Sequence, residues 1–124
     1  NFINVLNQIK PPFNINRAAL FTAAASIKDS KWIKKEIKHV NKWIKIFYKI
    51  FKNFDIETNL SSANFLLINF NKIKKDSRKI FLKLAKAGIL VRKMKVYNIN
   101  NSLRITIGNN LENKKFIKIL RKII

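Results

Sequence analysis

"LRITIG", residues 103–108, is the stretch that decides the fold. Apolar and polar residues alternate along it, which is the period of a β-strand with one buried face. Leu103, Ile105 and Ile107 are therefore predicted to face a core, while Arg104 and Thr106 point the other way. The segment indicates a sheet that lies against a hydrophobic core.

Further strands and helices are predicted on both sides of this segment. Strand-like runs occupy residues 54–58, 64–70 and 89–92, and helical spacing occupies residues 1–10, 17–28, 31–53, 78–87 and 111–124. In the helix at 31–53 the apolar residues alternate spacings of four and three, which places them on one face. The order predicts an α+β fold, with a small antiparallel sheet packed against helices that include one long helix.

Local residues predict where these helices begin and end. Asn16, Ser30 and Asn110 are the expected N-caps of three helices, and Asp76 or Ser77 is expected to cap a fourth. Gly88 is expected to stop the helix at 78–87. Pro11 and Pro12 impose an extended backbone ahead of the Asn16 cap.

The charge is strongly positive, with 27 Lys and Arg against 6 Asp and Glu and a net charge of +21. A nucleic-acid partner is one explanation. However, the chain has 22 Lys, 21 Ile and 17 Asn but only 5 Arg, and the lysines are spread along its whole length. We therefore attribute the charge to composition on solvated faces, and expect no nucleic-acid partner.

Few residues could carry catalysis in this chain. The single His39 lies near the apolar stripe of the long helix, where a hydrogen-bonding structural role is expected. The six carboxylates are scattered, so neither a metal site nor an acid–base pair is predicted. Cysteine is absent, and the longest uncharged run, residues 59–71, is too short to span a membrane. A cytoplasmic protein is expected.

Arginine is rare in this lysine-rich chain and could have a specific role. Its planar guanidinium group holds a phosphate or carboxylate through two hydrogen bonds. Arg92 ends one predicted strand and Arg104 lies on the next. The two side chains could therefore project toward one anion, although two ordinary surface arginines would show the same pattern.

Four motifs in this order resemble one enzyme family: "PPFNIN" (11–16), "SSANFLLINF" (61–70), "AGILVR" (87–92) and "YNINNSLRITIG" (97–108). Together with the closing "LENKKFIKIL", they are similar to the C-terminal part of histidinol-phosphate aminotransferase, a fold-type I enzyme that uses pyridoxal 5′-phosphate (PLP). The resemblance implies that residues 17–124 are the small domain and that residues 1–16 connect it to a large domain. It also implies a cytoplasmic homodimer.

The resemblance implies a role for each candidate. Arg104 and Arg92 would hold the phosphate of histidinol phosphate, and Arg104 would also hold a carboxylate of glutamate or 2-oxoglutarate. Asn64 and Asn14 are further substrate-binding candidates. PLP would be bound by the large domain, whose Schiff-base lysine has no counterpart here, since Ser30-Lys31 is a chance dipeptide. Asn98 stands where the family has glycine, and asparagine tolerates the left-handed backbone such a position requires.

The chain is therefore expected to be part of a longer enzyme and to be inactive alone. An aromatic aminotransferase and a threonine-phosphate decarboxylase are alternatives with the same fold. A small basic nucleic-acid-binding protein, or an interaction module that uses the long helix, is an alternative of another class.

Overall fold

The computed structural model describes residues 1–12 and 14–124. Its internal contacts separate two compact units, Asn1–Glu36 and Ile37–Ile124. The boundary falls inside the long helix α3, Ser30–Asn53. The sequence prediction divided the chain after residue 16, at a connector whose Phe13 lies outside the described residues. That division concerns the complete protein and stays a prediction.

The first unit consists of α1 (Phe2–Ile9), α2 (Arg17–Lys28) and the start of α3. The predicted cap of α2 is confirmed, because the Asn16 side chain accepts a 2.8 Å hydrogen bond from the amide of Ala19. The predicted cap of α3 was wrong. Asp29 accepts the amide of Trp32 at 2.9 Å, and Ser30 is already the first residue of the helix. A carboxylate caps as well as a hydroxyl, so either residue fitted the pattern.

The second unit holds the sheet. It adds β1 (Glu57–Thr58), β2 (Phe65–Asn69), α4 (Ser77–Lys86), β3 (Arg92–Lys93), the 3-10 turn η1 (Lys95–Tyr97), β4 (Ser102–Thr106) and α5 (Asn110–Ile123). The four strands lie in the order β1-β2-β4-β3, and each neighbouring pair is antiparallel. The α+β class and the antiparallel sheet are thus confirmed.

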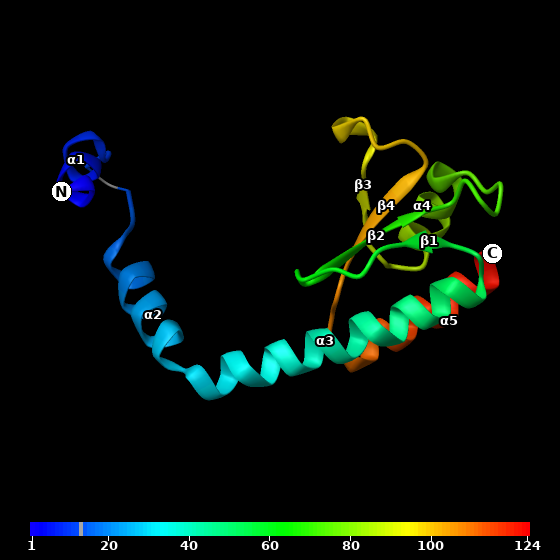
Figure 1. The fold of residues 1–124 in the computed structure, drawn as a ribbon, viewed down its shortest axis with the longest axis horizontal. Helices are drawn as coiled ribbons and strands as arrows, with labels where there is room; N and C mark the ends of the chain where they lie inside the picture. The colour runs from blue at the N-terminus through cyan, green and yellow to red at the C-terminus, as the bar shows by residue number, and fades with distance from the viewer. Residues whose placement is uncertain (13) are drawn as a thin grey trace. The chain divides into compact units, whose positions relative to one another are not determined.

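The core lies between one face of this sheet and the helices (Figure 1). Leu66 pairs with Ile105 and Ile68 with Leu103, and all four side chains are buried. The second half of α3 runs beside α5, where the ring of Phe47 meets that of Phe116 edge-on at 5.6 Å. The predicted alternation in residues 103–107 is confirmed, since Arg104 and Thr106 lie on the face away from this core.

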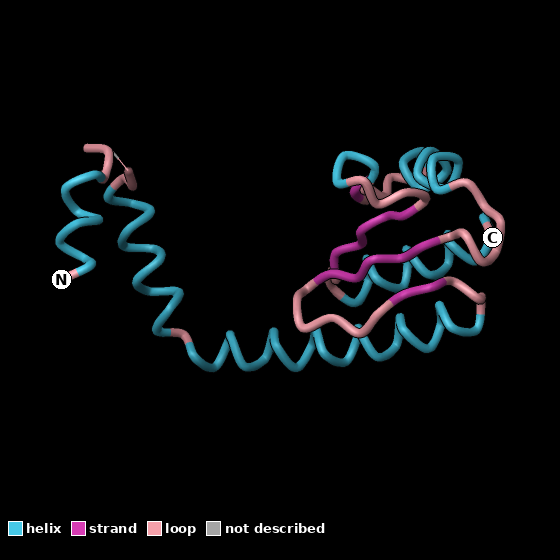
Figure 2. Tube along the Cα trace, turned by 45° about the horizontal axis from the view of Figure 1, so that its top comes forward, coloured by secondary structure: helices cyan, strands magenta, loops and turns pink. Residues whose placement is uncertain are grey.

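The strand predicted at residues 89–92 is shorter than expected. β3 begins only at Arg92, as Figure 2 shows by its short strand segment. The reason lies in the helix that precedes it. Gly88 adopts φ +72° and ends α4 as predicted, and the amide of Ile89 then donates to the carbonyl of Leu84 at 2.9 Å. That amide satisfies the helix end, so it does not join a strand ladder.

Asn109 caps α5, and the prediction that Asn110 does so was wrong. The Asn109 side chain accepts the amides of Leu111 and Glu112, while Glu112 accepts the Asn109 amide at 2.8 Å. This reciprocal capping box requires a glutamate three residues after the cap, which only Asn109 has. The Asn110 side chain instead accepts the indole N–H of Trp43 at 2.8 Å.

His39 has the structural surroundings expected of it. The ring is half-buried, and its Nε2 lies 2.9 Å from the carbonyl oxygen of Gly108. A side chain at Gly108 would displace the Glu112 carboxylate, because a Cβ there would lie 2.4 Å from one of its oxygens. The contact between His39 and Gly108 ties α3 to the tight turn between β4 and α5.

Leu66 provides a test of this core. It is 0% exposed, so Leu66→Ala is expected to lower the free energy of unfolding by about 2–5 kcal/mol through the cavity it leaves. Leu111→Ala is the matched control, because Leu111 is 78% exposed and its loss is expected to cost under about 0.5 kcal/mol. Urea titrations followed by circular dichroism would measure both, and equal losses would contradict the assigned core.

Candidate anion-binding site

Two arginines face each other across the edge of the sheet. Arg92 on β3 and Arg104 on β4 are direct partners in the antiparallel register. Directly opposed residues in such a pair project from the same face of the sheet. For both, this is the face away from the core, so the register brings two guanidinium groups to one side of adjacent strands. Two like charges in this arrangement destabilise the pairing unless an anion lies between them.

Four of the six acids of the chain have other partners. Asp29, Asp76 and Glu112 cap helices, and Asp55 forms the 2.5 Å ion pair with Lys72. That hydrogen bond, with the attraction between the two charges, raises the pKa of Lys72 above its usual value. Glu57 lies on β1, two strands from β4 and hence about 10 Å away. In the part of the chain that the structure describes, neither Arg92 nor Arg104 has a salt-bridge partner.

Each guanidinium rests on an aromatic ring. The Arg104 guanidinium carbon lies 4.8 Å from the centre of the Phe65 ring on β2. The Arg92 guanidinium carbon lies 5.2 Å from the ring of Tyr97 on η1, and its Nη2 also donates to the Tyr97 hydroxyl. Stacking on a ring face restricts the orientation of a cation without neutralising its charge. Both side chains are therefore oriented while their charge stays available.

Arg104 also carries an unsatisfied donor. Its Nε is buried but has no hydrogen-bond acceptor among the described residues, and it is the one buried side-chain nitrogen or oxygen in them of which this is true. Buried polar groups are almost always paired, and an exception needs an explanation such as a bound ligand. An acceptor supplied by a bound anion would satisfy this N–H.

The turn before β4 depends on two left-handed residues. Asn98 has φ +58° and Asn101 has φ +51°. The amide of Asn98 donates to the carbonyl of Lys95 at 3.0 Å and closes η1. The Asn101 side chain accepts the amide of Ser77 and donates to the carbonyl of Lys75, at 2.8 and 2.9 Å. The connection between β3 and β4 is thereby tied to the start of α4, and it carries Tyr97 at a defined position.

Of the two asparagine candidates, only Asn64 lies in the same unit as the arginines. Asn64 is exposed ahead of β2, and its backbone oxygen accepts the amide of Ile107 at 2.8 Å. Ile107 is three residues beyond Arg104, or about 10 Å along an extended chain. Asn14 is exposed in the first unit. Asn64 therefore lies outside the strand pairing that places Arg104 on the sheet.

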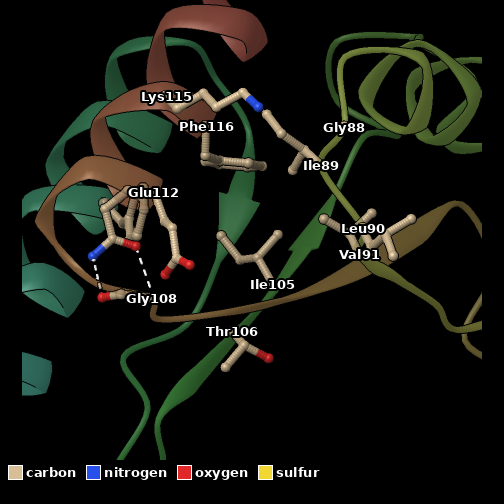
Figure 3. Close-up of a pocket in the computed structure, with 12 residues that line it drawn as sticks. Gly88, Ile89, Leu90, Val91, Ile105, Thr106, Gly108, Glu112, Lys115 and Phe116 are labelled. Atoms are coloured by element: carbon tan, nitrogen blue, oxygen red, sulfur yellow. Dashed lines mark hydrogen bonds between the residues drawn. The ribbon is translucent and has the colours of Figure 1, made fainter.

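A cavity of about 460 Å³ lies nearby, between α5, the end of β4 and residues 88–91 (Figure 3). Neither arginine lines it, and its walls include the apolar side chains of Ile105 and Phe116. These residues do not fit PLP. The single lysine on the cavity, Lys115, is exposed, and the carboxylate of Glu112 is already used in the cap of α5.

Residues 1–12 and 14–124 contain neither a cluster of metal ligands nor a membrane-spanning helix. No group of three or more His, Asp or Glu residues is placed to hold a metal ion there. Nor does any helix in that part combine the length and apolar character needed to cross a membrane.

Sequence reasoning found the arginines but missed their two aromatic partners. Phe65 could have been found from the strand register, because it is diagonal to Arg104, two residues from that arginine's direct partner Leu67. Tyr97 lies in a loop whose path no periodic pattern describes. Its signals are its place as the first residue of the motif at 97–108 and composition, since the chain has ten Phe but only two Tyr.

Comparison with known proteins gives consistent matches over almost the whole chain. The family model "Aminotransferase class I and II" matches residues 1–123. The histidinol-phosphate aminotransferase of Pelagibacter ubique is 38% identical over 98% of this chain, which corresponds to 34% of that enzyme. The chain thus spans about a third of the length of the curated relatives it matches.

Solved structures share the fold. The histidinol-phosphate aminotransferase of Clostridium acetobutylicum superposes with a TM-score of 0.81 at 24% identity, over 95% of this chain and 36% of that one. The enzyme of Sinorhizobium meliloti, solved in complex with PLP, gives a TM-score of 0.79 at 19% identity, over 98% of this chain and 34% of that one. At these identities the likeness concerns the fold.

Asn98 tests the turn that carries Tyr97. Asn98→Val places a β-branched residue at φ +58° and is expected to lower the free energy of unfolding by about 1–2 kcal/mol. Asn98→Gly is the control and is expected to cost little, because glycine adopts this conformation freely. The comparison is made by urea denaturation, and equal stability of the two variants would show that the left-handed turn is not required.

Proposed function

The chain belongs to the class I and II aminotransferase family, and we propose that it is the C-terminal, small-domain part of a histidinol-phosphate aminotransferase. The complete protein would transfer an amino group between histidinol phosphate and 2-oxoglutarate or glutamate, a step of histidine biosynthesis. Supporting this choice within the family, curated relatives that match at 29–38% identity carry that name. Because the chain spans about a third of those relatives, the activity is that of the longer protein.

The observation that carries the proposal is the pair of opposed arginines without an acid. Arg92 and Arg104 project from one face of the sheet, and the buried Nε of Arg104 lacks an acceptor in the described chain. A phosphate dianion offers three acceptor oxygens and two negative charges, which match two guanidinium groups. We assign the two arginines to the phosphate of the substrate, and Arg104 also to a carboxylate of glutamate or 2-oxoglutarate.

The physical contribution of these residues is positioning. Two charge-assisted contacts at the phosphate end of the substrate fix its position and leave the amine end free to reach the cofactor. Stacking on Phe65 and Tyr97 reduces the rotational freedom that the arginines would otherwise lose on binding. Lysines, which have longer and freer stems and a single charged nitrogen, would hold a planar or tetrahedral anion less well.

Membership of this family implies PLP as the cofactor, which supplies the electron sink for amino transfer. Since the residues lining the 460 Å³ cavity do not fit PLP, the cofactor is assigned to the part of the protein outside this chain. We further propose a homodimer located in the cytoplasm. Asn64 and Asn14 remain candidates for contacts that form only in the complete protein.

Two alternatives keep the same fold. An aromatic aminotransferase would use the arginines for carboxylates, and a threonine-phosphate decarboxylase would use them for a different phosphorylated amino acid. Histidinol phosphate carries a phosphate and no carboxylate, so activity on it separates the first alternative from the proposal. A basic nucleic-acid-binding protein would bind DNA with an affinity that falls steeply with salt, and would not require the arginine pair.

Substitution of the arginines tests the assignment. In the complete enzyme, Arg104→Lys is expected to lower kcat/KM for histidinol phosphate roughly 10- to 100-fold, because a hydrogen bond to a charged group is worth about 1.5–3 kcal/mol. Lys34→Ala removes an exposed lysine and serves as the control, with kcat/KM expected within a factor of about two. Similar losses in the two variants would count against the role of Arg104.

The chain alone tests where the cofactor binds. The 124-residue polypeptide is expected to show no transaminase activity and to leave the absorbance spectrum of added PLP unchanged. A spectral shift that saturates at one PLP per chain during titration would mean that a particular lysine of this chain forms the imine. That result would contradict the assignment of PLP to the rest of the protein.

A further inference from the structure

We propose that Tyr97 is a third member of the anion site, holding Arg92 in place and donating its own hydroxyl proton to the bound phosphate. The inference rests on the proposed function, because it takes Arg92 as a phosphate ligand. Tyr97 lies in the connection between β3 and β4, and although it begins the motif at 97–108, the resemblance gave it no role.

Two contacts hold Arg92 against Tyr97. The guanidinium carbon lies 5.2 Å from the ring centre, and Nη2 donates to the phenol oxygen. Arg92 is otherwise an exposed residue on a strand of only two residues. A side chain with several rotatable bonds at such a position has little else to orient it. Tyr97 therefore acts as a positioning residue for Arg92.

The direction of this hydrogen bond leaves a donor free. Arginine has no acceptor, so in the contact Arg92 donates and the Tyr97 oxygen accepts. The hydroxyl proton of Tyr97 is then free to point to a further acceptor. An anion held by the guanidinium that this oxygen touches lies within reach of that proton, and O–H donors to phosphate form strong, short hydrogen bonds.

The contrast with Arg104 supports a role for the hydroxyl. Arg104 stacks on Phe65, so a ring alone is enough to orient a guanidinium at this site. In a chain with ten Phe and two Tyr, the ring beneath Arg92 carries a hydroxyl. Tyr97 is also 50% exposed, so the hydroxyl is not required to satisfy a buried core. Besides accepting from Arg92, the hydroxyl has its own proton to donate to an anion.

The position of Tyr97 is set by the backbone on both sides. Its amide donates to the carbonyl of Met94 at 2.9 Å, and Asn98 follows in the left-handed conformation. Tyr97 therefore ends a closed turn rather than a free loop. A donor held in this way costs little ordering entropy when the anion binds.

The test compares three variants of the complete enzyme. Tyr97→Phe keeps the ring and removes the hydroxyl, Tyr97→Leu removes both, and Arg92→Gln removes the guanidinium. Tyr97→Phe is expected to raise KM for histidinol phosphate roughly 5- to 15-fold with kcat within about twofold, as for the loss of one ground-state hydrogen bond. Tyr97→Leu is expected to raise KM more than Tyr97→Phe does, because it removes the ring as well as the hydroxyl.

A dephosphorylated substrate provides the internal control. With histidinol, which lacks the phosphate, Tyr97→Phe is expected to change kcat/KM by less than about twofold. If Tyr97→Phe keeps the wild-type KM for histidinol phosphate while Arg92→Gln is impaired, the proposed role of Tyr97 is wrong and the proposed function still stands. No impairment in Arg92→Gln would overturn both. An equal loss on histidinol and histidinol phosphate would show that Tyr97 is only structural.

Discussion

The pairing of β3 with β4 is the interaction on which the site depends. It is only two residues long, yet its register places Arg92 directly opposite Arg104. A shift of one residue would turn one guanidinium toward the core, because side chains alternate between the two faces of a strand. The opposed like charges disfavour this register in the absence of an anion. The surrounding structure must therefore hold β3 in place by other means.

Those other means lie at the two ends of β3. Before it, Gly88 ends α4, and the half-buried Ile89 and Val91 pack against the core. At its far end Lys93, the last residue of β3, places its ammonium group 4.9 Å from the ring of Phe81 on α4. These contacts attach the segment to the helix layer rather than to β4. A pair of like charges is thus kept in register by packing at the two ends of β3.

The sequence predicted most of the fold and half of the site. Alternation in residues 103–107 and the apolar run at 64–70 were sufficient for the sheet, because burial on one face follows directly from a period of two. Where two adjacent residues could both cap, as at Asp29-Ser30 and Asn109-Asn110, propensity alone chose the wrong one. At α5 the cap is the asparagine three residues before Glu112. At α3 the cap is Asp29, whose side chain accepts the amide of Trp32. Tyr97 was missed because its contact with Arg92 depends on the path of an irregular turn.

The central claim is that Arg92 and Arg104 share one phosphate, and a crystal structure of the complete enzyme with bound histidinol phosphate tests it most directly. Phosphate oxygens are expected within about 2.7–3.1 Å of nitrogen atoms from both guanidinium groups, with Arg104 Nε among the donors. A phosphate bound elsewhere, with both arginines turned to solvent or paired with carboxylates of the protein, would contradict it.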